Sequence, residues 1–443
     1  MSDPLSSGFQ RAGGGTLDEH IIIIGAGHGG VQAAASLREE GYEGRLTLVS
    51  GDPELPYHKP PLSKVFLKSP DAEPQILRAR LFYDTQNIEL ETGVCVTGIA
   101  PETRTLTLDD GRQLGWSRLL LATGAEPRRL TVPGSECAGV LYLRDCADAR
   151  VLRDALVRAQ NIVVIGGGFI GLEVAATAAM AGKGVTVVEA AERILGRAVS
   201  ARVADHMHAY HESLGVRILT NAGVARLVGE KGNLRSVITS DGRELVGEKG
   251  NLRSVITSDG RELSADIVLV GIGALPNTAL AEAAGLACDN GVRVDASCRT
   301  SAADVYAIGD CVSFPHAASG RTLRLESVQN ATDQARIAAK AMLGKDAAYD
   351  AVPWFWSDQG ERKLQMAGLP FDVDREIVTG DPESGAFGVY LFSGARLVAV
   401  ETVNRPGEHM MARRMLAAGF SPSVEEVLEG PAALKAAMMA AER

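Results

Sequence analysis

The sequence predicts an α/β fold in which two similar units each place a glycine-rich turn between a buried strand and a helix. The first unit begins near residue 20 and the second near residue 161. Each has an apolar run, glycines in G-x-G-x-x-G spacing and a following segment rich in small residues. A chain of 443 residues is also too long for one compact core. These observations predict two Rossmann-like domains within a chain of two or three domains.

The first unit supplies a strand, a turn, a helix and a second strand. Ile21 to Ile24 is wholly apolar, which suits a parallel strand buried on both faces. A helix of small residues then runs to Gly41, a good residue to end a helix, and a strand follows near residues 46–49. The turn between the first strand and the helix holds four glycines, Gly25, Gly27, Gly29 and Gly30.

The second unit repeats this plan and gives the pattern its specificity. Its turn carries Gly166, Gly168 and Gly171, and its second strand ends at Glu189. One G-x-G-x-x-G is weak support, but two copies that each lie between a strand and a helix are strong. The glycines let the backbone approach a pyrophosphate, and the helix N-terminus offers unpaired N–H groups. The sequence therefore predicts two dinucleotide sites.

Charge and composition exclude several classes of protein. The formal net charge of −10 argues against nucleic acid or an anionic membrane as the main partner. No apolar run approaches the roughly 18 residues of a membrane span. Residues 1–19 lack the apolar core of a signal peptide and are expected to form a flexible tail. The six cysteines show neither C-x-x-C nor zinc spacing, so we expect no metal site, reduced thiols and a cytoplasmic protein.

One segment is repeated without change. Residues 228–245 and 246–263 are identical, and each copy reads as a strand, an Asp-Gly turn and a return strand. Perfect identity indicates a recent tandem duplication or an assembly error. We expect one copy to form the native hairpin and the other to protrude from the surface, without a function.

The motifs between and after the two units resemble the glutathione-reductase-type flavoproteins. Within them the chain is similar to the ferredoxin reductases of the putidaredoxin, rhodocoxin and aromatic-dioxygenase systems. The resemblance extends from Ile21 to about Ala418, and its most specific pieces are "PPLSK", "GGGFIGLEVAATA", "RLESVQNATDQAR", "PWFWSDQ" and "VNRP". It implies an FAD-binding domain at 20–127 and 271–345, an inserted NAD-binding domain at 128–270, and a C-terminal α+β interface domain at 346–443.

The resemblance also implies which residues contact FAD. Asp310 ends the pattern "TSAADVYAIGD" and meets the ribityl chain in relatives. A helix that begins near Val328 would stabilise negative charge on the reduced flavin, and Arg128 and Val96 match other contact positions. Many relatives carry an acid directly after the second strand, where this chain has Gly51. We expect Asp52 to hold the adenosine ribose, with Glu54 as the alternative.

Glu189 predicts the nicotinamide preference. A carboxylate at the end of the second strand accepts hydrogen bonds from both ribose hydroxyls and repels a 2′-phosphate, which favours NADH. Arg193 lies four residues later and could weaken this preference for NADH, but an exposed arginine is more often simply solvated. The turn glycines of the second unit, together with Gly273 in "VGIGALPN", complete the predicted NADH site.

Four residues are predicted to act at the flavin. In relatives a lysine at the position of Lys64 and a glutamate at that of Glu173 meet beside the flavin N5 edge; an ion pair that only joins two domains is the alternative. Phe169 is expected to lie over the isoalloxazine as a gate, or else simply to pack at a helix start. Trp354 and Trp356 are expected to face opposite sides of a strand, with Trp356 towards the flavin.

The resulting function is an NADH-dependent ferredoxin reductase. FAD would pass electrons to a two-iron ferredoxin that serves a monooxygenase or a ring-hydroxylating dioxygenase, and the ferredoxin would dock near Trp356, Arg405, Arg413 and Arg414. A solvated basic face is the ordinary reading of those arginines, and a monomer or weak dimer is expected.

Three other functions were weighed. A disulfide reductase needs a low-pKa cysteine beside the flavin, and "PYHKPPLSK" contains none. A reductase of a small molecule, of the quinone or monodehydroascorbate type, fits the same nucleotide sites. A redox-regulated flavoprotein resembling apoptosis-inducing factor is disfavoured by the acidic charge.

Overall fold

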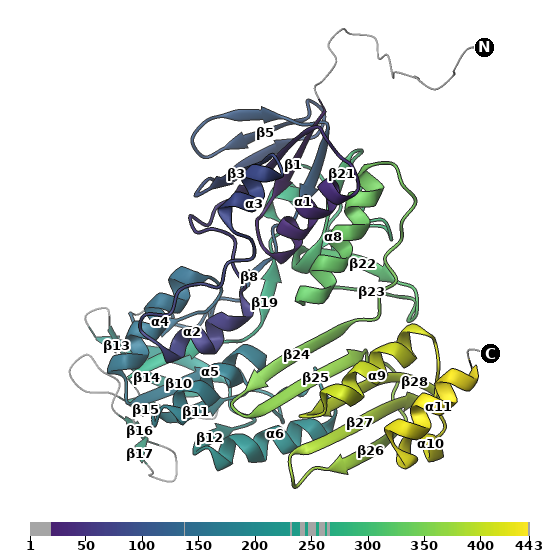
Figure 1. Ribbon diagram of the computed structural model, residues 1–443. Coiled ribbons are helices and arrows are strands. Elements are labelled where there is room, and N and C mark those ends of the chain that lie inside the picture. Colours follow the sequence, from purple (N-terminus) through teal and green to yellow (C-terminus); the bar gives the residue numbers. More distant parts are fainter. Residues whose placement is uncertain are drawn as a thin grey trace, which may run out of the picture.

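The computed structural model describes residues 19–136, 138–230, 233–239, 244–246, 254–256, 262–263 and 266–441. Of the tail predicted at residues 1–19, only Glu19 belongs to these residues, and Cys137 lies outside them. Figure 1 shows the first glycine-rich unit in the upper part of the molecule, the second at lower left and the C-terminal segment at lower right.

The first unit builds a five-stranded parallel sheet in the order β21-β7-β1-β2-β3. All of Ile21 to Ile24 is buried, as the apolar run predicts, because both faces of the sheet are covered. Helices pack on one face and a small antiparallel sheet on the other. The parallel strands are β1 (His20–Ile24), β2 (Arg45–Ser50), β3 (Ile88–Thr92), β7 (Arg118–Leu121) and β21 (Val305–Ala307); the helices are α1 (His28–Glu39), α3 (Arg80–Thr85) and α8 (Val328–Met342); the small sheet is β4 (Val96–Ala100), β5 (Thr105–Leu108) and β6 (Gln113–Gly115).

Strand β21 comes from a segment almost 200 residues beyond β7, yet the two pair directly, through Val305 and Leu119. The chain leaves this part of the molecule through β8 (Ala125–Pro127) and returns through β19 (Ala274–Pro276), which pair antiparallel. After the return come α7 (Ala279–Ala283), β20 (Val292–Arg293), the 3-10 turn η2 (Gly309–Cys311), β22 (Val312–His316) and β23 (Arg321–Leu323).

The second unit builds another five-stranded parallel sheet, in the order β12-β11-β10-β18-β9. Its helices share one large hydrophobic cluster, which also takes in Tyr57, Leu62 and Phe66 from the "PYHKPPLSK" region. That region is thereby held against the helices of the second sheet. The strands are β9 (Val140–Leu141), β10 (Asn161–Ile165), β11 (Gly184–Val188), β12 (Val216–Leu219) and β18 (Ile267–Val270); the helices are α4 (Cys146–Arg158), α5 (Phe169–Met180) and α6 (Ala201–Ser213); the added region holds η1 (Pro60–Ser63) and α2 (Val65–Lys68).

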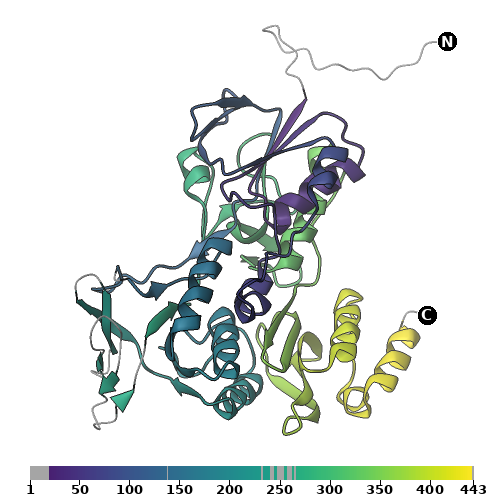
Figure 2. The ribbon, with the colours of Figure 1, turned by 60° about the vertical axis from the view of Figure 1, so that its left-hand side comes forward.

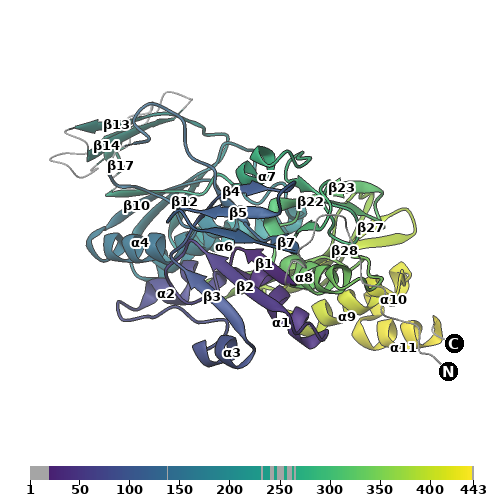
Figure 3. The ribbon, with the colours of Figure 1, turned by 90° about the horizontal axis from the view of Figure 1, so that it is seen from above.

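The repeated segment forms part of one antiparallel meander, β13-β14-β15-β16-β17. Val237 pairs with Leu245 in the first copy, and Val255 pairs with Leu263 at the same positions of the second. Both copies therefore make the same pairing, and the second extends the sheet of the first; the Asp-Gly turns lie outside the described residues. Figure 3 shows these strands on the opposite side of the molecule from the C-terminal helices. The strands are β13 (Val224–Glu230), β14 (Asn233–Thr239), β15 (Glu244–Val246), β16 (Ser254–Ile256) and β17 (Glu262–Leu263).

The C-terminal segment is an antiparallel sheet in the order β24-β25-β28-β27-β26 with three helices. One face packs into the cluster shared by α5 and α6, through residues such as Leu364 and Phe387. The other face is covered by the helices, through Met415 and Leu434; Figure 2 shows these helices on the outside. The elements are β24 (Trp354–Gln359), β25 (Arg362–Gly368), β26 (Arg375–Asp381), β27 (Ala386–Ser393), β28 (Arg396–Val403), α9 (Pro406–Ala417), α10 (Val424–Glu429) and α11 (Pro431–Ala441). Among the described helices, none has both the length and the apolar character that crossing a bilayer requires.

A buried carboxylate joins this sheet to the second unit. Glu401 is 1% exposed, and its carboxylate accepts hydrogen bonds from the backbone N–H and the hydroxyl of Ser200, the residue that caps α6. Burial raises the pKa of Glu401 to about 7, although the Ser200 hydrogen bonds oppose this shift. The folded protein therefore binds this proton more tightly than the unfolded chain does.

The shift predicts a pH-dependent stability. Because the folded-state pKa is raised, the contribution of Glu401 is fully present below about pH 4.5 and is lost as the pH rises through 7. Glu401→Gln should remove this loss. The difference in free energy of unfolding between the variant and the wild type should therefore shift in favour of the variant by about 2 kcal/mol from pH 5 to pH 8. Urea unfolding at both pH values measures it, with the exposed Glu429→Gln as a control. Equal pH profiles for wild type and Glu401→Gln would contradict the assignment.

Candidate functional site

The first glycine-rich turn has the shape that a pyrophosphate requires. Gly25 has φ +105°, and a Cβ there would lie 2.2 Å from the carbonyl oxygen of Ala122. A Cβ on Gly30 would lie 1.8 Å from the carbonyl oxygen of Gly25, so α1 packs directly on the turn. By contrast, nothing lies within 4 Å of a Cβ built on Gly27. Two glycines thus allow close packing, while the third leaves open space at the N-terminus of α1.

A cluster of cationic side chains surrounds this turn. Arg144 Nη2 lies 3.3 Å from Asp310 Oδ2. Burial, together with the charge of Arg144, lowers the pKa of Lys59 to about 8, although the charge of Asp310 opposes this shift. Burial likewise lowers the pKa of His28, inside the turn, to about 4. A bound anion would stabilise the positive charges of Lys59 and Arg144, so the residues present fit a dinucleotide pyrophosphate.

The two acids after β2 are both held by protein partners. Asp52 Oδ2 accepts a hydrogen bond of 2.7 Å from the Tyr57 hydroxyl, and its Oδ1 accepts one from the backbone N–H of Glu54. Glu54 Oε1 lies 2.6 Å from Arg150 Nη1. A role for Asp52 at the adenosine ribose stays a prediction.

The second glycine-rich turn repeats the geometry of the first. Gly166 has φ +103°, and a Cβ on Gly171 would lie 2.4 Å from the Gly166 carbonyl oxygen. The space beside Gly168 is nearly open. Glu189 Oε2 accepts a hydrogen bond of 2.7 Å from the backbone N–H of Gly167, which places its carboxylate at the turn. This arrangement fits a second dinucleotide, with Glu189 beside its ribose.

The other predicted contact residues lie around the two turns. A Cβ on Gly29 would touch Ile308 and Ala331, so this glycine lets α1 approach α8. Arg128 is exposed, and its backbone N–H donates to the Gly273 carbonyl at 2.9 Å, where the chain passes between the two sheets. Val328 opens α8, which Ser327 caps. Val96 begins β4 in the small sheet.

Lys64 and Glu173 are in contact. Lys64 Nζ lies 2.7 Å from Glu173 Oε2, with the two side chains 18% and 6% exposed. Lys64 also donates to the Pro60 carbonyl at 3.1 Å. Glu173 accepts two further hydrogen bonds, from the hydroxyls of Ser63 and Ser357. The pair joins the segment after η1 to α5. Each glycine-rich unit therefore contributes one residue to this ion pair.

Strand β24 presents different side chains on its two faces. The expectation that Trp354 and Trp356 face opposite ways is wrong: their ring centroids are 5.6 Å apart. Side chains alternate along a strand, so residues two apart share a face. The opposite face carries Phe355, whose ring centroid lies 4.7 Å from that of Phe169 at the start of α5.

The three arginines of the C-terminal segment differ in their surroundings. Arg405 Nε lies 2.7 Å from the buried Glu408, so this side chain is tied to its own helix. Arg413 lies 4.2 Å from the ring centroid of Trp354. Arg414 is exposed. Of the three, Arg413 is the one whose cationic group contacts the face of β24 that carries the tryptophans.

Several residues at these sites have no motif that singles them out. Lys59 and Arg144 form the cationic cluster beside His28, and Ser63 and Ser357 contact Glu173. His58 and Lys59 lie inside "PYHKPPLSK", and Ser357 lies inside "PWFWSDQ". These motifs indicate that the surrounding residues belong to the site, although they do not single out these three. For Arg144 the sequence offers no such indication, since only the fold brings it to Asp310.

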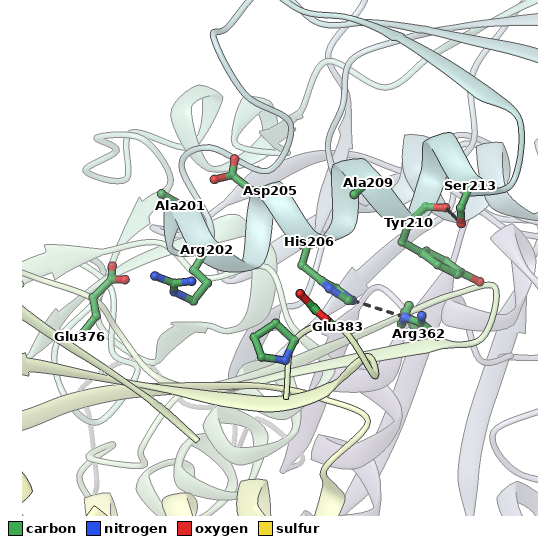
Figure 4. Close-up of a pocket in the computed structure, with 11 residues that line it drawn as sticks. Ala201, Arg202, Asp205, His206, Ala209, Tyr210, Ser213, Arg362, Glu376 and Glu383 are labelled. Carbon is green, nitrogen blue, oxygen red and sulfur yellow. Dashed lines mark hydrogen bonds between the residues drawn. The ribbon is translucent and has the colours of Figure 1, made fainter. Parts of the chain in front are cut away.

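A separate cavity of about 600 Å³ lies between α6 and the C-terminal sheet. Figure 4 shows His206 and Arg362 facing each other there, joined by a hydrogen bond of 3.3 Å. Burial, then the charge of Arg362, lowers the pKa of His206. The cavity is lined by none of the predicted flavin or nicotinamide residues. The described residues also hold no cluster of His, Cys, Asp and Glu suited to a metal ion.

Two family models match the chain. Residues 19–335 match the model described as pyridine nucleotide-disulphide oxidoreductase, and residues 354–438 match the model described as reductase C-terminal. The first covers both glycine-rich units and the second covers the antiparallel sheet with its helices.

Three relatives show how far the likeness extends. Rhodocoxin reductase of Rhodococcus erythropolis is 42% identical over 94% of each chain. Rubredoxin-NAD(+) reductase of Pseudomonas putida is 39% identical over 87% of this chain and 96% of its own. The structure of a covalent putidaredoxin reductase–putidaredoxin complex superposes with a TM-score of 0.85, at 37% identity, over 97% of this chain and 100% of the other.

Proposed function

The chain belongs to the pyridine nucleotide-disulphide oxidoreductase family, and from this premise we propose that it reduces a two-iron ferredoxin with electrons from NADH. It is a flavoprotein oxidoreductase, and its cofactors are FAD and a nicotinamide dinucleotide. The ferredoxin would serve a monooxygenase or a ring-hydroxylating dioxygenase.

The observation that carries the proposed acceptor is the match to a reductase solved together with its ferredoxin partner. That match spans 97% of this chain and includes the C-terminal segment. The C-terminal segment also matches the reductase C-terminal model over residues 354–438. The rubredoxin reductase among the relatives makes a one-iron rubredoxin the second acceptor to test.

The cysteines argue against disulfide reduction. A redox-active cysteine needs a stabilised thiolate and hence a lowered pKa. Burial instead raises the pKa of each of the five described cysteines, Cys95, Cys146, Cys288, Cys298 and Cys311. Among the described cysteines, Cys146 contacts the "PYHKPPLSK" segment through its backbone N–H, which donates to the Tyr57 hydroxyl, but its thiol is buried.

The two glycine-rich turns would hold the two cofactors. We assign FAD to 20–127 with 271–345 and the nicotinamide to 128–270, leaving 346–443 for the partner. Lys59 and Arg144 would bind the FAD pyrophosphate, and Asp310 would meet the ribityl chain. FAD, when bound there, would supply the chemistry that links two-electron hydride transfer from NADH to one-electron transfer. Lys64, fixed by Glu173, would place a cation where negative charge develops, and Phe169 would give way to the nicotinamide.

Glu189 sets the expected preference for NADH. Its carboxylate, held by the backbone N–H groups of Gly167 and Ala191, would accept the ribose hydroxyls and repel a 2′-phosphate. Glu189→Ala should raise the NADH Michaelis constant about tenfold and narrow the gap to NADPH, because about 1.4 kcal/mol of binding is lost. Steady-state kinetics with both nucleotides measures it, with the neighbouring Glu192→Ala as a control. An unchanged NADH/NADPH ratio contradicts the role.

The ferredoxin is proposed to dock over the face of β24 that carries Trp354 and Trp356. Arg413 and Arg414 supply positive charge there, which favours association with an acidic ferredoxin. Arg405 contributes less to this proposal, since Glu408 neutralises it. We further propose a monomer or weak dimer in the cytoplasm, where the free thiols of the described cysteines stay reduced.

A panel of acceptors tests the function. The purified yellow protein is supplied with NADH and, in turn, a two-iron ferredoxin, a one-iron rubredoxin, a disulfide, a quinone and dioxygen. The proposal expects the ferredoxin to give the largest kcat/KM and a rate that falls as salt rises. A disulfide or quinone that outpaces every ferredoxin overturns it, and slow turnover with all acceptors would favour a redox-regulated flavoprotein.

A further inference from the structure

A chain of buried hydrogen bonds leads from α6 to the Lys64–Glu173 pair. His211 Nε2 lies 2.8 Å from Gln359 Oε1, and Gln359 Nε2 donates to the Ser357 hydroxyl at 3.1 Å. The Ser357 hydroxyl in turn donates to Glu173 Oε1 at 2.7 Å. His211, Gln359 and Ser357 are each 0% exposed. The chain therefore runs entirely inside the protein and ends on the carboxylate that holds Lys64.

Every donor in this chain points the same way. The amide oxygen of Gln359 can only accept, so His211 must carry its proton on Nε2. The single hydroxyl proton of Ser357 goes to Glu173, which leaves its oxygen free to accept from Gln359. Aligned donors polarise one another, and a hydrogen bond to a charged acceptor is stronger than one between neutral groups. The three side chains thus direct one line of dipoles at the Glu173 carboxylate.

The far end of the chain has no competing partner within the described part of the molecule. His211 Nδ1 is buried and has no hydrogen bond there. Burial lowers the pKa of His211, so the ring stays neutral and supplies one fixed N–H. Ser357 and Gln359 share a face of β24 because they are two residues apart. That face contacts α5 through Ser357 and Glu173, and α6 through Gln359 and His211.

We propose that Ser357, Gln359 and His211 are positioning residues that hold the Glu173 carboxylate in a fixed orientation, and through it set the position of the Lys64 ammonium at the flavin. The proposal rests on the proposed function, because it assigns these residues to the reduction of FAD by NADH. In this proposal the C-terminal segment has a second role besides partner docking, because β24 contributes Ser357 and Gln359 to the flavin site.

Rapid kinetics of flavin reduction test the proposal without any ferredoxin. Ser357→Ala should slow reduction at saturating NADH about five- to tenfold and leave the NADH dissociation constant and the FAD content unchanged. Ser357→Thr, which keeps a hydroxyl, should restore most of the rate. Ser313→Ala is the matched control, since the buried Ser313 hydroxyl has no hydrogen-bond partner among the described residues; it should leave the rate unchanged.

A double variant of Ser357 and Lys64 distinguishes a positioning role of Ser357 from a general structural role. If Ser357 acts through Lys64, then adding Ser357→Ala to Lys64→Ala should slow reduction by less than twofold further. If Ser357 only supports the fold, the two effects should multiply. Gln359→Met provides a second variant that interrupts the same chain without changing Ser357.

A measurement on the flavin-free protein gives a readout independent of catalysis. With ¹⁵N-labelled histidine, NMR should show His211 protonated on Nε2 only. Both Gln359→Met and Ser357→Ala should shift its Nε2 resonance, the latter from two side chains away. An unmoved resonance in Ser357→Ala, or multiplying kinetic effects, overturns the proposal. A Lys64→Ala variant with normal flavin reduction would instead overturn the assigned role of the pair, while the NMR result would stand.

Discussion

Lys64→Ala should slow the reduction of bound FAD by NADH about 10- to 100-fold while the protein still binds FAD. A preorganised cation at a site of developing negative charge contributes on the order of 1.4 to 3 kcal/mol to the transition state. The "PYHKPPLSK" segment contains no cysteine, so it offers no thiol for a covalent relay in place of Lys64. Stopped-flow loss of flavin absorbance measures the rate, and the ratio of flavin to protein absorbance measures FAD content.

The control for Lys64→Ala must separate lost catalysis from lost stability. Removing only the lysine leaves Glu173 as a buried carboxylate held by Ser63 and Ser357; breaking one side of a buried pair costs about 3 kcal/mol or more. Lys64→Met with Glu173→Gln removes both charges and should recover most of this stability but none of the rate. Fast reduction in the double variant would show that the pair only joins two parts of the fold.

Gly27→Ala should weaken FAD binding about 10- to 100-fold and leave the stability of the flavin-free protein unchanged. In the structure a methyl group at Gly27 meets no atom within 4 Å, and the backbone has φ −72°, which any residue adopts. The loss should arise only when a dinucleotide occupies that space, because the methyl group keeps its pyrophosphate from the N-terminus of α1. Titration of flavin-free protein with FAD measures the dissociation constant.

Substitutions of two other glycines serve as comparisons for Gly27→Ala. Gly30→Ala should destabilise the flavin-free protein itself, by about 1 to 3 kcal/mol, since its methyl group would lie 1.8 Å from the Gly25 carbonyl oxygen. Gly407→Ala, exposed and equally open at the start of α9, should change neither property. If Gly27→Ala binds FAD as tightly as Gly407→Ala does, the pyrophosphate does not lie at this turn.

The two sheets could be predicted because their signals are local. An all-apolar run such as Ile21 to Ile24 excludes an exposed strand, and glycines in fixed spacing exclude an ordinary helix start. The prediction for β24 is wrong for a local reason: alternation along a strand puts Trp354 and Trp356, two residues apart, on the same face and not on opposite ones. The structure corrects this and shows that the other face, with Phe355, Ser357 and Gln359, is the one that meets α5 and α6.

The sequence by itself determined the α/β fold class, the two dinucleotide turns and, through resemblance, Lys64 and Glu173. In "PYHKPPLSK" the missing cysteine was visible without a structure. Only the tertiary structure decided what surrounds the pair: Ser63 from one unit, Ser357 from the C-terminal sheet, and His211 behind it. It also brought Arg144 to Asp310, 166 residues away. Spacing along the chain reports turns and helix faces, because these depend on near neighbours. It carries no information about which distant side chains meet, since that depends on how three separately formed units pack together.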